Sequence, residues 1–381
     1  MAKLGEVCKV SPSTKNIERQ GAWLLNLDMV EQQTGRVVEY NFVGEDGLNG
    51  SITQFDTENV LYSKLRPNLN KVVLPERNGF CTSELLPLRP DARKLDRSYL
   101  AVFLRSDGFV NWAVSKTAGA KMPRLGTKDL LNANIPLPEI KEQKAIAEKF
   151  EKLEELIFLR KQQIAKLDEL VKARFVEMFG DFEVNPKEFP VYHLCELCDV
   201  GSSKRIYQEE QSISGIPFLK VADLNELIDT GKYLCSTFIP LERYEQLLHK
   251  ELTPKENDIL ITSRGTLGKC YIVQSDDEFY FQDGMISWLS NLSPKVSSIY
   301  ISYLFAQPYI QKQIESLQAG STVAYLSIAM LKKMNVILPP KKLQDDFATF
   351  VEHVDQQKQT VQQSLEKLEL MKKALMQEYF G

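Results

Sequence analysis

Apolar residues recur at alternating steps of four and three from Ile146 to Met178, and eight of the ten positions in this series are apolar. The same spacing returns from Phe347 to Tyr379, again with eight apolar positions of ten. A heptad of this kind is typical of a helix that packs along another helix. Prolines precede each series and a glycine follows each, as helix ends favour. The pattern therefore predicts two long helices, the first from about Gln143 to Phe179.

The two helices are expected to pack against each other along these apolar positions. The first would be about 55 Å long, more than one small domain can cover. Since a whole domain connects them, the chain permits an antiparallel pair; the alternative is that each helix packs on its own domain. The residues that we assign to the helix seam are Ile146, Phe150, Leu153, Ile157, Ile164, Leu167, Phe347, Val351, Val354, Val361, Leu365 and Leu368.

The helices close two copies of a longer repeat. Residues 99–180 align with residues 300–381 at a constant offset of 201, and 21 of the 82 aligned pairs are identical. Ordinary residue usage would give about five identities. Shorter similarities have other offsets, 190 for residues 4–10 and 198 for residues 66–71, which indicates insertions within the copies. The repeat is too long for a solenoid unit and predicts two similar globular bodies in tandem.

Each body is expected to be a mixed α and β domain. Helical patterns cover residues 99–115 and 300–316. Short strands are predicted at residues 60–62, 71–74, 258–262, 270–273 and 278–281. The predicted fold class is α+β: two similar mixed α/β domains separated by two long antiparallel coiled-coil helices, with a pseudo-two-fold internal repeat. The expected boundaries are 1–138 and 182–339 for the domains, and 139–181 and 340–381 for the helices.

Composition is that of an ordinary globular protein. Of the 381 residues, 43% are hydrophobic and 26% are charged. No apolar run approaches the roughly 20 residues that span a bilayer, and the first residues lack a signal peptide's apolar core. Of the six cysteines, only Cys195 and Cys198 are closely spaced, which without a second pair is weak support for zinc. We therefore expect reduced thiols, no metal site and a cytoplasmic location.

A search for catalytic patterns finds no convincing site. The three histidines share no metal-ligand spacing. The loop Gly265–Lys269 resembles a phosphate-binding loop, but Ser263 and Cys270 stand where that loop requires a glycine and a serine or threonine. Nucleophile elbows, zinc-protease motifs and glycine-rich cofactor fingerprints are missing as well. We therefore expect that the chain is not an enzyme and that any chemistry belongs to a partner.

Basic, amide-rich loops are the remaining candidates for function. Residues 64–71 and 115–128 form two such loops in the first domain, and residues 202–205 and 264–269 form two in the second. Lysine and arginine suit phosphate contacts, and asparagine, serine or arginine can bind base edges. Residues 316–329, which align with the basic stretch 115–128, carry no charge. Two domains of one fold would therefore recognise different things.

Charge limits the kind of DNA binding that these loops could support. A net charge of −4 and a pI near 5.7 exclude a protein that coats DNA by charge alone, but permit a specific reader with local basic patches. The candidate DNA-binding residues are Lys64, Arg66, Asn68, Lys71, Lys116, Lys121 and Arg124 in the first domain, and Lys204, Arg205, Arg264, Thr266, Lys269, Ser321 and Tyr325 in the second.

Taken in order, these segments resemble the specificity subunits of type I DNA restriction–modification systems, over essentially the whole chain. The resemblance rests on Leu61–Lys71 and Ala118–Leu125 in the first domain, and on Ile216–Leu224 and Asp258–Lys269 in the second. Ile135–Pro138 followed by Glu142–Ile146 resembles the family's helix start. The second helix start, Leu338–Gln344, departs from it by lacking the Glu-Gln pair.

The resemblance implies a non-catalytic subunit without a cofactor of its own. Such subunits carry two target-recognition domains that read a bipartite sequence in double-stranded DNA, and their helices set the gap between its halves. They recruit two methyltransferase subunits, which use S-adenosylmethionine, and ATP-dependent restriction subunits, two where these are present. The alternative that the residues leave open is a coiled-coil adaptor that holds protein partners together without reading DNA. A free-standing nuclease or methyltransferase is opposed by the missing motifs.

Overall fold

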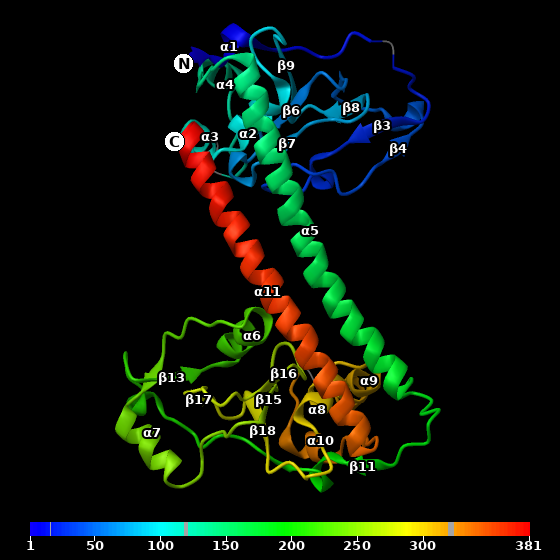
Figure 1. Ribbon diagram of the computed structural model, residues 1–381, viewed down its shortest axis with the longest axis vertical. Coiled ribbons are helices and arrows are strands. Elements are labelled where there is room, and N and C mark those ends of the chain that lie inside the picture. Colours follow the sequence, from blue (N-terminus) through cyan, green and yellow to red (C-terminus); the bar gives the residue numbers. More distant parts are fainter. Residues whose placement is uncertain (16, 118–120, 319–323) are drawn as a thin grey trace. The chain divides into compact units, whose positions relative to one another are not determined.

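The computed structural model describes residues 1–15, 17–117, 121–318 and 324–381. The chain divides into two compact units (Figure 1). Unit 1 comprises Met1–Gln163 and Thr360–Gly381, and unit 2 comprises Ile164–Gln359. Each unit therefore contains one domain together with a segment of each of two long helices, and each is described by itself below.

Domain 1, in unit 1, is built on two four-stranded sheets. The first has the order β2-β9-β6-β7 and is antiparallel throughout, with the strands Cys8–Val10, Leu85–Pro90, Val60–Ser63 and Val72–Val73. The second has the order β4-β3-β8-β5, with the strands Phe42–Val43, Ala22–Leu25, Gly79–Thr82 and Ile52–Phe55, and its β3–β8 pair is parallel. A separate short pair joins β1 (Ala2–Lys3) to β10 (Asn134–Ile135).

Domain 2, in unit 2, repeats the first of these sheets. The order β12-β18-β15-β16 matches β2-β9-β6-β7 strand for strand, and its strands are Asp199–Gly201, Ile286–Ser290, Ile259–Thr262 and Cys270–Ile272. A three-stranded sheet has the order β14-β13-β17, with the strands Phe238–Ile239, Ile216–Leu219 and Tyr280–Phe281. The pair β11 (Val191–His193) and β19 (Asn335–Ile337) corresponds to β1–β10.

Short helices pack on these sheets. Domain 1 has α1 (Leu4–Val7), α2 (Arg97–Arg105), α3 (Asp107–Ser115) and α4 (Thr127–Asn132), with the 3-10 turns η1 (Leu27–Met29), η2 (Glu45–Gly47) and η3 (Pro67–Leu69). Domain 2 has α6 (Val221–Thr230), α7 (Leu241–Leu248), α8 (Ser298–Phe305), α9 (Pro308–Leu317) and α10 (Ile328–Lys333), with η4 (Leu194–Glu196) and η5 (Gln208–Glu210). The mixed α and β character predicted for both domains is confirmed.

The helical patterns over residues 99–115 and 300–316 each resolve into two helices rather than one. In domain 1 the break falls at Ser106, whose hydroxyl accepts a hydrogen bond from the Phe109 N–H at 3.3 Å and caps α3. In domain 2 the second helix begins at Pro308, whose missing N–H suits the first turn of a helix. Periodicity alone misses both breaks because the apolar spacing continues across them.

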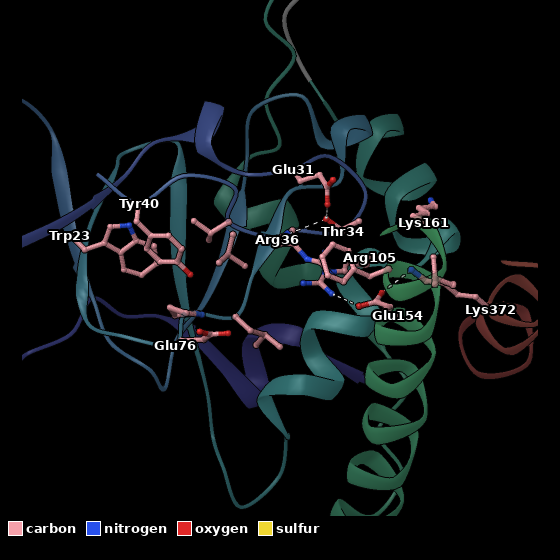
Figure 2. A pocket seen from close by; sticks show the side chains of 17 residues that line it. Trp23, Glu31, Thr34, Arg36, Tyr40, Glu76, Arg105, Glu154, Lys161 and Lys372 are labelled. Atoms are coloured by element: carbon pink, nitrogen blue, oxygen red, sulfur yellow. Dashed lines mark hydrogen bonds and ion pairs between the residues drawn. The ribbon is translucent and has the colours of Figure 1, made fainter. Parts of the chain in front are cut away.

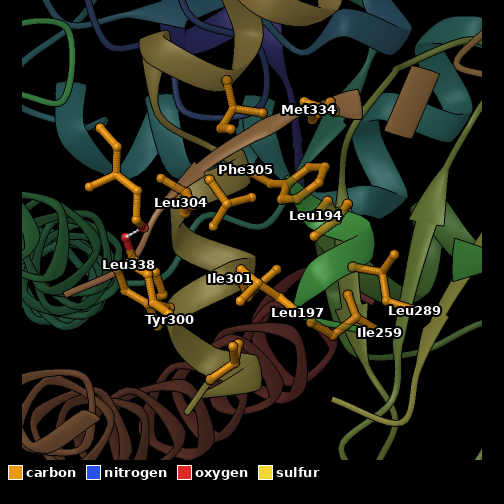
Figure 3. Packing of buried hydrophobic residues seen from close by; sticks show 14 of the residues in the cluster. Leu194, Leu197, Ile259, Leu289, Tyr300, Ile301, Leu304, Phe305, Met334 and Leu338 are labelled. Carbon is orange, nitrogen blue, oxygen red and sulfur yellow. Dashed lines mark hydrogen bonds between the residues drawn. The ribbon is translucent and has the colours of Figure 1, made fainter. Parts of the chain in front are cut away.

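The core of unit 2 shows how helix and sheet residues share one apolar interior (Figure 3). Tyr300, Ile301 and Leu304 on α8 are buried in one cluster with Ile259 of β15 and Leu289 of β18. Unit 1 has the equivalent cluster around Tyr99 and Leu100. The tyrosine hydroxyls are satisfied in the same way, because Tyr99 and Tyr300 donate to the main-chain carbonyls of Pro136 and Ile337.

The two long helices are α5 (Ile140–Phe179) and α11 (Lys341–Phe380), each 40 residues long. In unit 1 they lie side by side and antiparallel (Figure 1). Lys149 Nζ donates to the Tyr379 hydroxyl at 2.9 Å, and Lys161 lies 3.0 Å from Glu369. In unit 2 the same relation holds, with Asp168 bonded to Lys358 and Phe175 packed 5.3 Å from Phe347, measured between ring centroids. The predicted antiparallel pairing therefore holds within each unit.

The residues assigned to the helix seam are all shielded from solvent at least in part. Ile157, Ile164 and Leu368 are half-buried. The rest of the seam is buried, namely Ile146, Phe150, Leu153, Leu167, Phe347, Val351, Val354, Val361 and Leu365.

The end of each long helix completes the core of the domain that belongs to the other copy of the repeat. In unit 1, Phe380 at the end of α11 lies 5.4 Å from the ring of Tyr99 and 5.9 Å from that of Phe103. In unit 2, Phe179 at the end of α5 lies 5.1 Å from the ring of Tyr300. Each domain therefore depends on both copies, which explains why the repeat keeps its length unchanged from residue 99 onward.

A buried glutamine that the sequence analysis missed fixes the start of α5. Gln143 is fully buried and makes three hydrogen bonds at 2.8–2.9 Å. Its side-chain oxygen accepts from the Asp96 N–H, and its amide donates to the carbonyls of Lys94 and Pro138. These bonds tie the first turn of the helix to the loop before α2.

The same anchor is present in the second copy. Gln344 is fully buried, accepts from the Ser297 N–H, and donates to the carbonyls of Lys295 and Pro339, at 2.7–3.0 Å. The second helix start therefore lacks only the glutamate of the Glu-Gln pair. The glutamine that holds the helix is retained, and its identity at an offset of 201 was the signal that could have found it.

Candidate nucleic-acid interface

In domain 1 the two basic loops predicted from the sequence lie side by side. The loop after β6 pairs with the segment before α4 through two main-chain hydrogen bonds. The Leu125 N–H donates to Lys64 O at 2.9 Å, and the Arg66 N–H donates to Pro123 O at 2.8 Å. These bonds make Leu65 and Arg124 a bridged pair. Segments 60 residues apart in the chain therefore form one surface.

Within this surface, several candidate side chains point to solvent. Arg66, Asn68, Lys116 and Lys121 are exposed, and Lys64 is half-buried. A tight turn, Pro67–Leu69, carries Asn68 at its centre. These are the groups that domain 1 can offer to phosphates and base edges.

Two other candidates in domain 1 already have partners within the protein. Lys71 donates from its ammonium to Leu27 O at 2.5 Å, and loss of hydration lowers its pKa. Arg124 forms a forked ion pair with Glu84, with its nearest contact at 3.0 Å, and this pairing raises the pKa of the guanidinium. Lys71 therefore holds the loop in place, whereas Arg124 is 43% exposed and remains on the surface.

Domain 2 repeats the arrangement with other side chains. The Leu326 N–H donates to Ser263 O at 3.0 Å, and Arg264 and Tyr325 form the bridged pair. Arg264, Thr266 and Tyr325 are exposed. Lys269 is held by Asp229, with its ammonium 2.6 Å from a carboxylate oxygen.

A third segment lies at the same edge of domain 2. Ser202 accepts from the Gly284 N–H at 3.2 Å, and Arg205 pairs with Asp283 at 2.9 Å. The turn that contains Asp283 also holds the loop after β15, because the Ser263 N–H donates to Met285 O at 2.9 Å. The exposed Lys204 and Arg205 therefore share this edge with Arg264. Ser321 and residues 118–120 lie outside the described residues.

The main-chain pairing corrects one detail of the repeat alignment. The sequence similarity of residues 66–71 to residues 264–269 sets Arg66 against Arg264. In the structure, the residue bridged to the segment before α4 or α10 is Leu65 in domain 1 and Arg264 in domain 2. Arg66 is therefore equivalent to Gly265. One residue more in the loop of domain 1 accounts for the shift.

A cavity in unit 1 was not expected from the sequence (Figure 2). It has a volume of about 310 Å³ and lies between domain 1 residues such as Tyr40 and the α5 residues Glu154 and Phe158. Glu154 accepts ion pairs from Arg105 at 3.1 Å and from Lys372 at 2.7 Å. Glu154, Arg105 and Lys372 therefore form a structural charge network. Burial lowers the pKa of Arg105, and the nearby Glu154 carboxylate opposes this shift. The only signal for this network in the sequence was Arg105, the arginine at the end of the apolar run of α2.

Two further findings concern the described residues. Within them, no group of histidine, cysteine, aspartate or glutamate side chains could hold a metal ion. None of the helices in the described part of the chain is long and apolar enough to cross a membrane.

Comparison with known proteins places the repeat in a family. A family model described as the type I restriction modification DNA specificity domain matches residues 2–169 and again residues 186–370. The chain is 30% identical over 124 residues to the type I restriction enzyme EcoDI specificity subunit of Escherichia coli, covering 32% of this chain and 27% of that protein. It is 25% identical over 321 residues to the MjaVIII specificity subunit of Methanocaldococcus jannaschii, covering 79% and 73%.

Solved structures agree at the level of the fold. The S subunit of a type I restriction-modification system from M. genitalium has a TM-score of 0.61 with 16% identity, over 100% of this chain and 95% of that one. A chain from a study of complex assembly and conformational transition of the type I R-M system has a TM-score of 0.60 with 17% identity, over 100% and 96%. With two matched domains that cover most of its length, the chain belongs to the type I restriction modification DNA specificity family.

Proposed function

We propose that this chain is the DNA-reading subunit of a type I restriction–modification complex, and that each domain reads one half of a bipartite target in double-stranded DNA. The observation that carries the proposal is the pair of bridged loops that recurs at the same place in both domains. The backbone of this surface is repeated while its exposed side chains differ. That is the arrangement expected of two readers with one fold and two specificities.

The proposal divides the chain into four segments. Residues 1–138 and 182–339 are the two target-recognition domains, and residues 139–181 and 340–381 are the spacer helices. The DNA contacts are assigned to the exposed members of the two bridged surfaces, with Arg66 and Arg264 at their centres. Lys71 and Lys269 are assigned a supporting role, since both ammonium groups already have protein partners.

The partners belong to the same proposal. The chain carries no catalytic group of its own in this account, so two methyltransferase subunits would dock through the helices and supply S-adenosylmethionine-dependent adenine methylation. Two ATP-dependent restriction subunits would join in systems that cleave DNA. The assembly would work in the cytoplasm, where the genome is.

The direct test is the map of methylated adenines in the source genome, with and without this gene. We expect methylation at one two-part sequence with a gap of fixed length, and its loss when the gene is deleted. Unchanged methylation in the deletion strain, or a map without a two-part sequence, would refute the proposal. Exchange of Arg66 and Arg264 for alanine, one at a time, should each weaken recognition of a different half of the sequence.

A further inference from the structure

The loop after β6 in domain 1 and the equivalent loop after β15 in domain 2 both contain a residue with a left-handed backbone, but the residue type differs. In domain 2 the residue that follows the bridged Arg264 is Gly265, with φ at +76°. In domain 1 the residue that follows the bridged Leu65 is Arg66, with φ at +48°. Glycine adopts this conformation freely, whereas a residue with a side chain is destabilised by it. Domain 1 therefore keeps an arginine where its own fold favours glycine.

Nothing inside the described protein compensates for this strain. The Arg66 side chain is exposed and has no hydrogen bond or ion pair to another described residue. Its main-chain bonds, from its N–H to Pro123 O and from the Leu69 N–H to its carbonyl, would form equally well with glycine. Removal of the side chain would therefore cost the fold no hydrogen bond or ion pair.

The second left-handed position of the same loop shows the contrast. Asn70, with φ at +50°, is buried and donates hydrogen bonds to Gln33 at 3.2 Å and to Arg105 O at 3.0 Å. Its equivalent in domain 2 is Gly268, where a Cβ would lie 2.7 Å from Ile314. Both residues at this second position are explained by the fold. Arg66 is not, and at Gly265 an added Cβ would meet nothing within 4 Å, so space does not decide the choice there.

We propose that Arg66 is the residue with which domain 1 reads a base, and that its strained backbone is retained for this contact. The inference rests on the proposed function. A phosphate can be reached from many points of a lysine-bearing loop, whereas a base edge requires a donor at one fixed place. The guanidinium fork binds guanine O6 and N7 in the major groove, the commonest specific contact of arginine. The half-site of domain 1 therefore contains a G·C pair that Arg66 reads.

The experiment selects binding sites from a random duplex pool with the full-length chain and its methyltransferase subunits. Wild type is compared with Arg66→Gly, Arg66→Ala and the control Glu188→Gly. Glu188 is also left-handed, at φ +52°, and exposed, but it lies in the segment between α5 and β11, apart from the reading loops. We expect both Arg66 variants to lose preference at one G·C position of one half-site, by about tenfold to a hundredfold. The other half-site and the Glu188→Gly motif should be unchanged.

Thermal unfolding tests the backbone strain at Arg66 separately from the base contact. Arg66→Gly should unfold about 2 °C above Arg66→Ala, because only glycine relieves the left-handed strain. A binding motif that is unaltered in both Arg66 variants, or a preference that falls evenly over all positions, would overturn the base contact. If Arg66→Gly unfolds at no higher temperature than Arg66→Ala, the inferred backbone strain at Arg66 is refuted. Wild type that selects no two-part motif would instead refute the proposed function itself.

Discussion

At the bridged loops, domain 1 presents Arg66 and an Arg124–Glu84 ion pair, whereas domain 2 presents Gly265, Tyr325 and Met285 at the equivalent places. One main-chain bond that joins the loops recurs in both domains, from the Leu125 N–H to Lys64 O in domain 1 and from the Leu326 N–H to Ser263 O in domain 2. Because this bond and the bridged pair are made by the backbone, the exposed side chains beside them can change without breaking the pairing. This separation of scaffold from surface is what allows one domain design to serve two targets.

The helix pairing shows a second difference between the units. In unit 1, Glu154 on α5 is bonded to Arg105 and Lys372. In unit 2 the equivalent residues are Asp355, Ala306 and Val171, so the network has no counterpart. The two units thus share packing but differ in how much of their stability depends on charge.

The largest effect that separates the units should come from Glu154→Gln. The Arg105 side chain is only 10% exposed, and a buried charge that loses its partner typically costs about 3 kcal/mol or more. The matched change in unit 2, Asp355→Asn, removes an exposed carboxylate and should alter the free energy of unfolding by less than about 0.5 kcal/mol. Urea unfolding of the full chain measures both. Equal losses in the free energy of unfolding would show that the charge network of unit 1 adds no stability beyond that of an exposed carboxylate.

A smaller effect, and one that should be equal in the two units, is expected at the helix anchors. Gln143→Leu and Gln344→Leu each remove three hydrogen bonds from a fully buried site and should cost about 2 kcal/mol each. Hydrogen exchange of the first turns of α5 and α11 reports each loss locally. A loss confined to one helix would contradict the shared anchor.

Acid should distinguish the domains by two buried carboxylates that are not equivalent in the repeat, Asp56 a few residues before β6 and Asp258 directly before β15. Burial alone would raise the pKa of Asp56, but hydrogen bonds from Arg89, Ser13 and the Glu58 amide outweigh it and lower this pKa well below its usual value. Its stabilising contribution is therefore complete above about pH 4 and is lost as the pH falls further.

Asp258 in domain 2 should respond in the opposite direction. Burial raises its pKa despite hydrogen bonds from the Lys255 N–H and the Trp288 indole. Its contribution to stability is therefore present near pH 4 and is lost as the pH rises through the elevated pKa. Hydrogen exchange of β6 and β15 between pH 6 and pH 3 measures the stability contributions of both aspartates, with Asp56→Asn and Asp258→Asn as controls. Parallel changes in the two strands would contradict the assigned shifts.

The smallest effect concerns DNA binding by Arg124. Its guanidinium is shared with Glu84, so Arg124→Ala should weaken binding only about threefold to tenfold, and only through the half-site of domain 1. Tyr325→Ala should act on the other half-site alone. Titration of duplexes that carry one intact half-site separates the two variants. An effect of either variant on both half-sites would contradict the assignment of one half-site to each domain.

The sequence predicted the features that depend on local periodicity. The heptad from Ile146 to Met178 and the gapless repeat indicated two long helices, because side chains three and four residues apart share a helix face. The bridge between Leu65 and Arg124, the Arg105–Glu154 ion pair and the left-handed backbone at Arg66 depend on residues brought together from distant parts of the chain. No local pattern encodes them. The same limit explains why the sequence did not show that Lys71 and Lys269, basic residues in basic loops, already have partners within the protein.

The most direct test of two readers in one chain is the affinity of the full chain with its methyltransferase subunits for four duplexes, which carry both half-sites, the first alone, the second alone, or neither. We predict that loss of either half-site weakens specific binding by at least a hundredfold. Arg66→Ala should then weaken only the duplexes that retain the half-site of domain 1. Full affinity for a duplex with one half-site, or equal affinity for all four, would contradict the account.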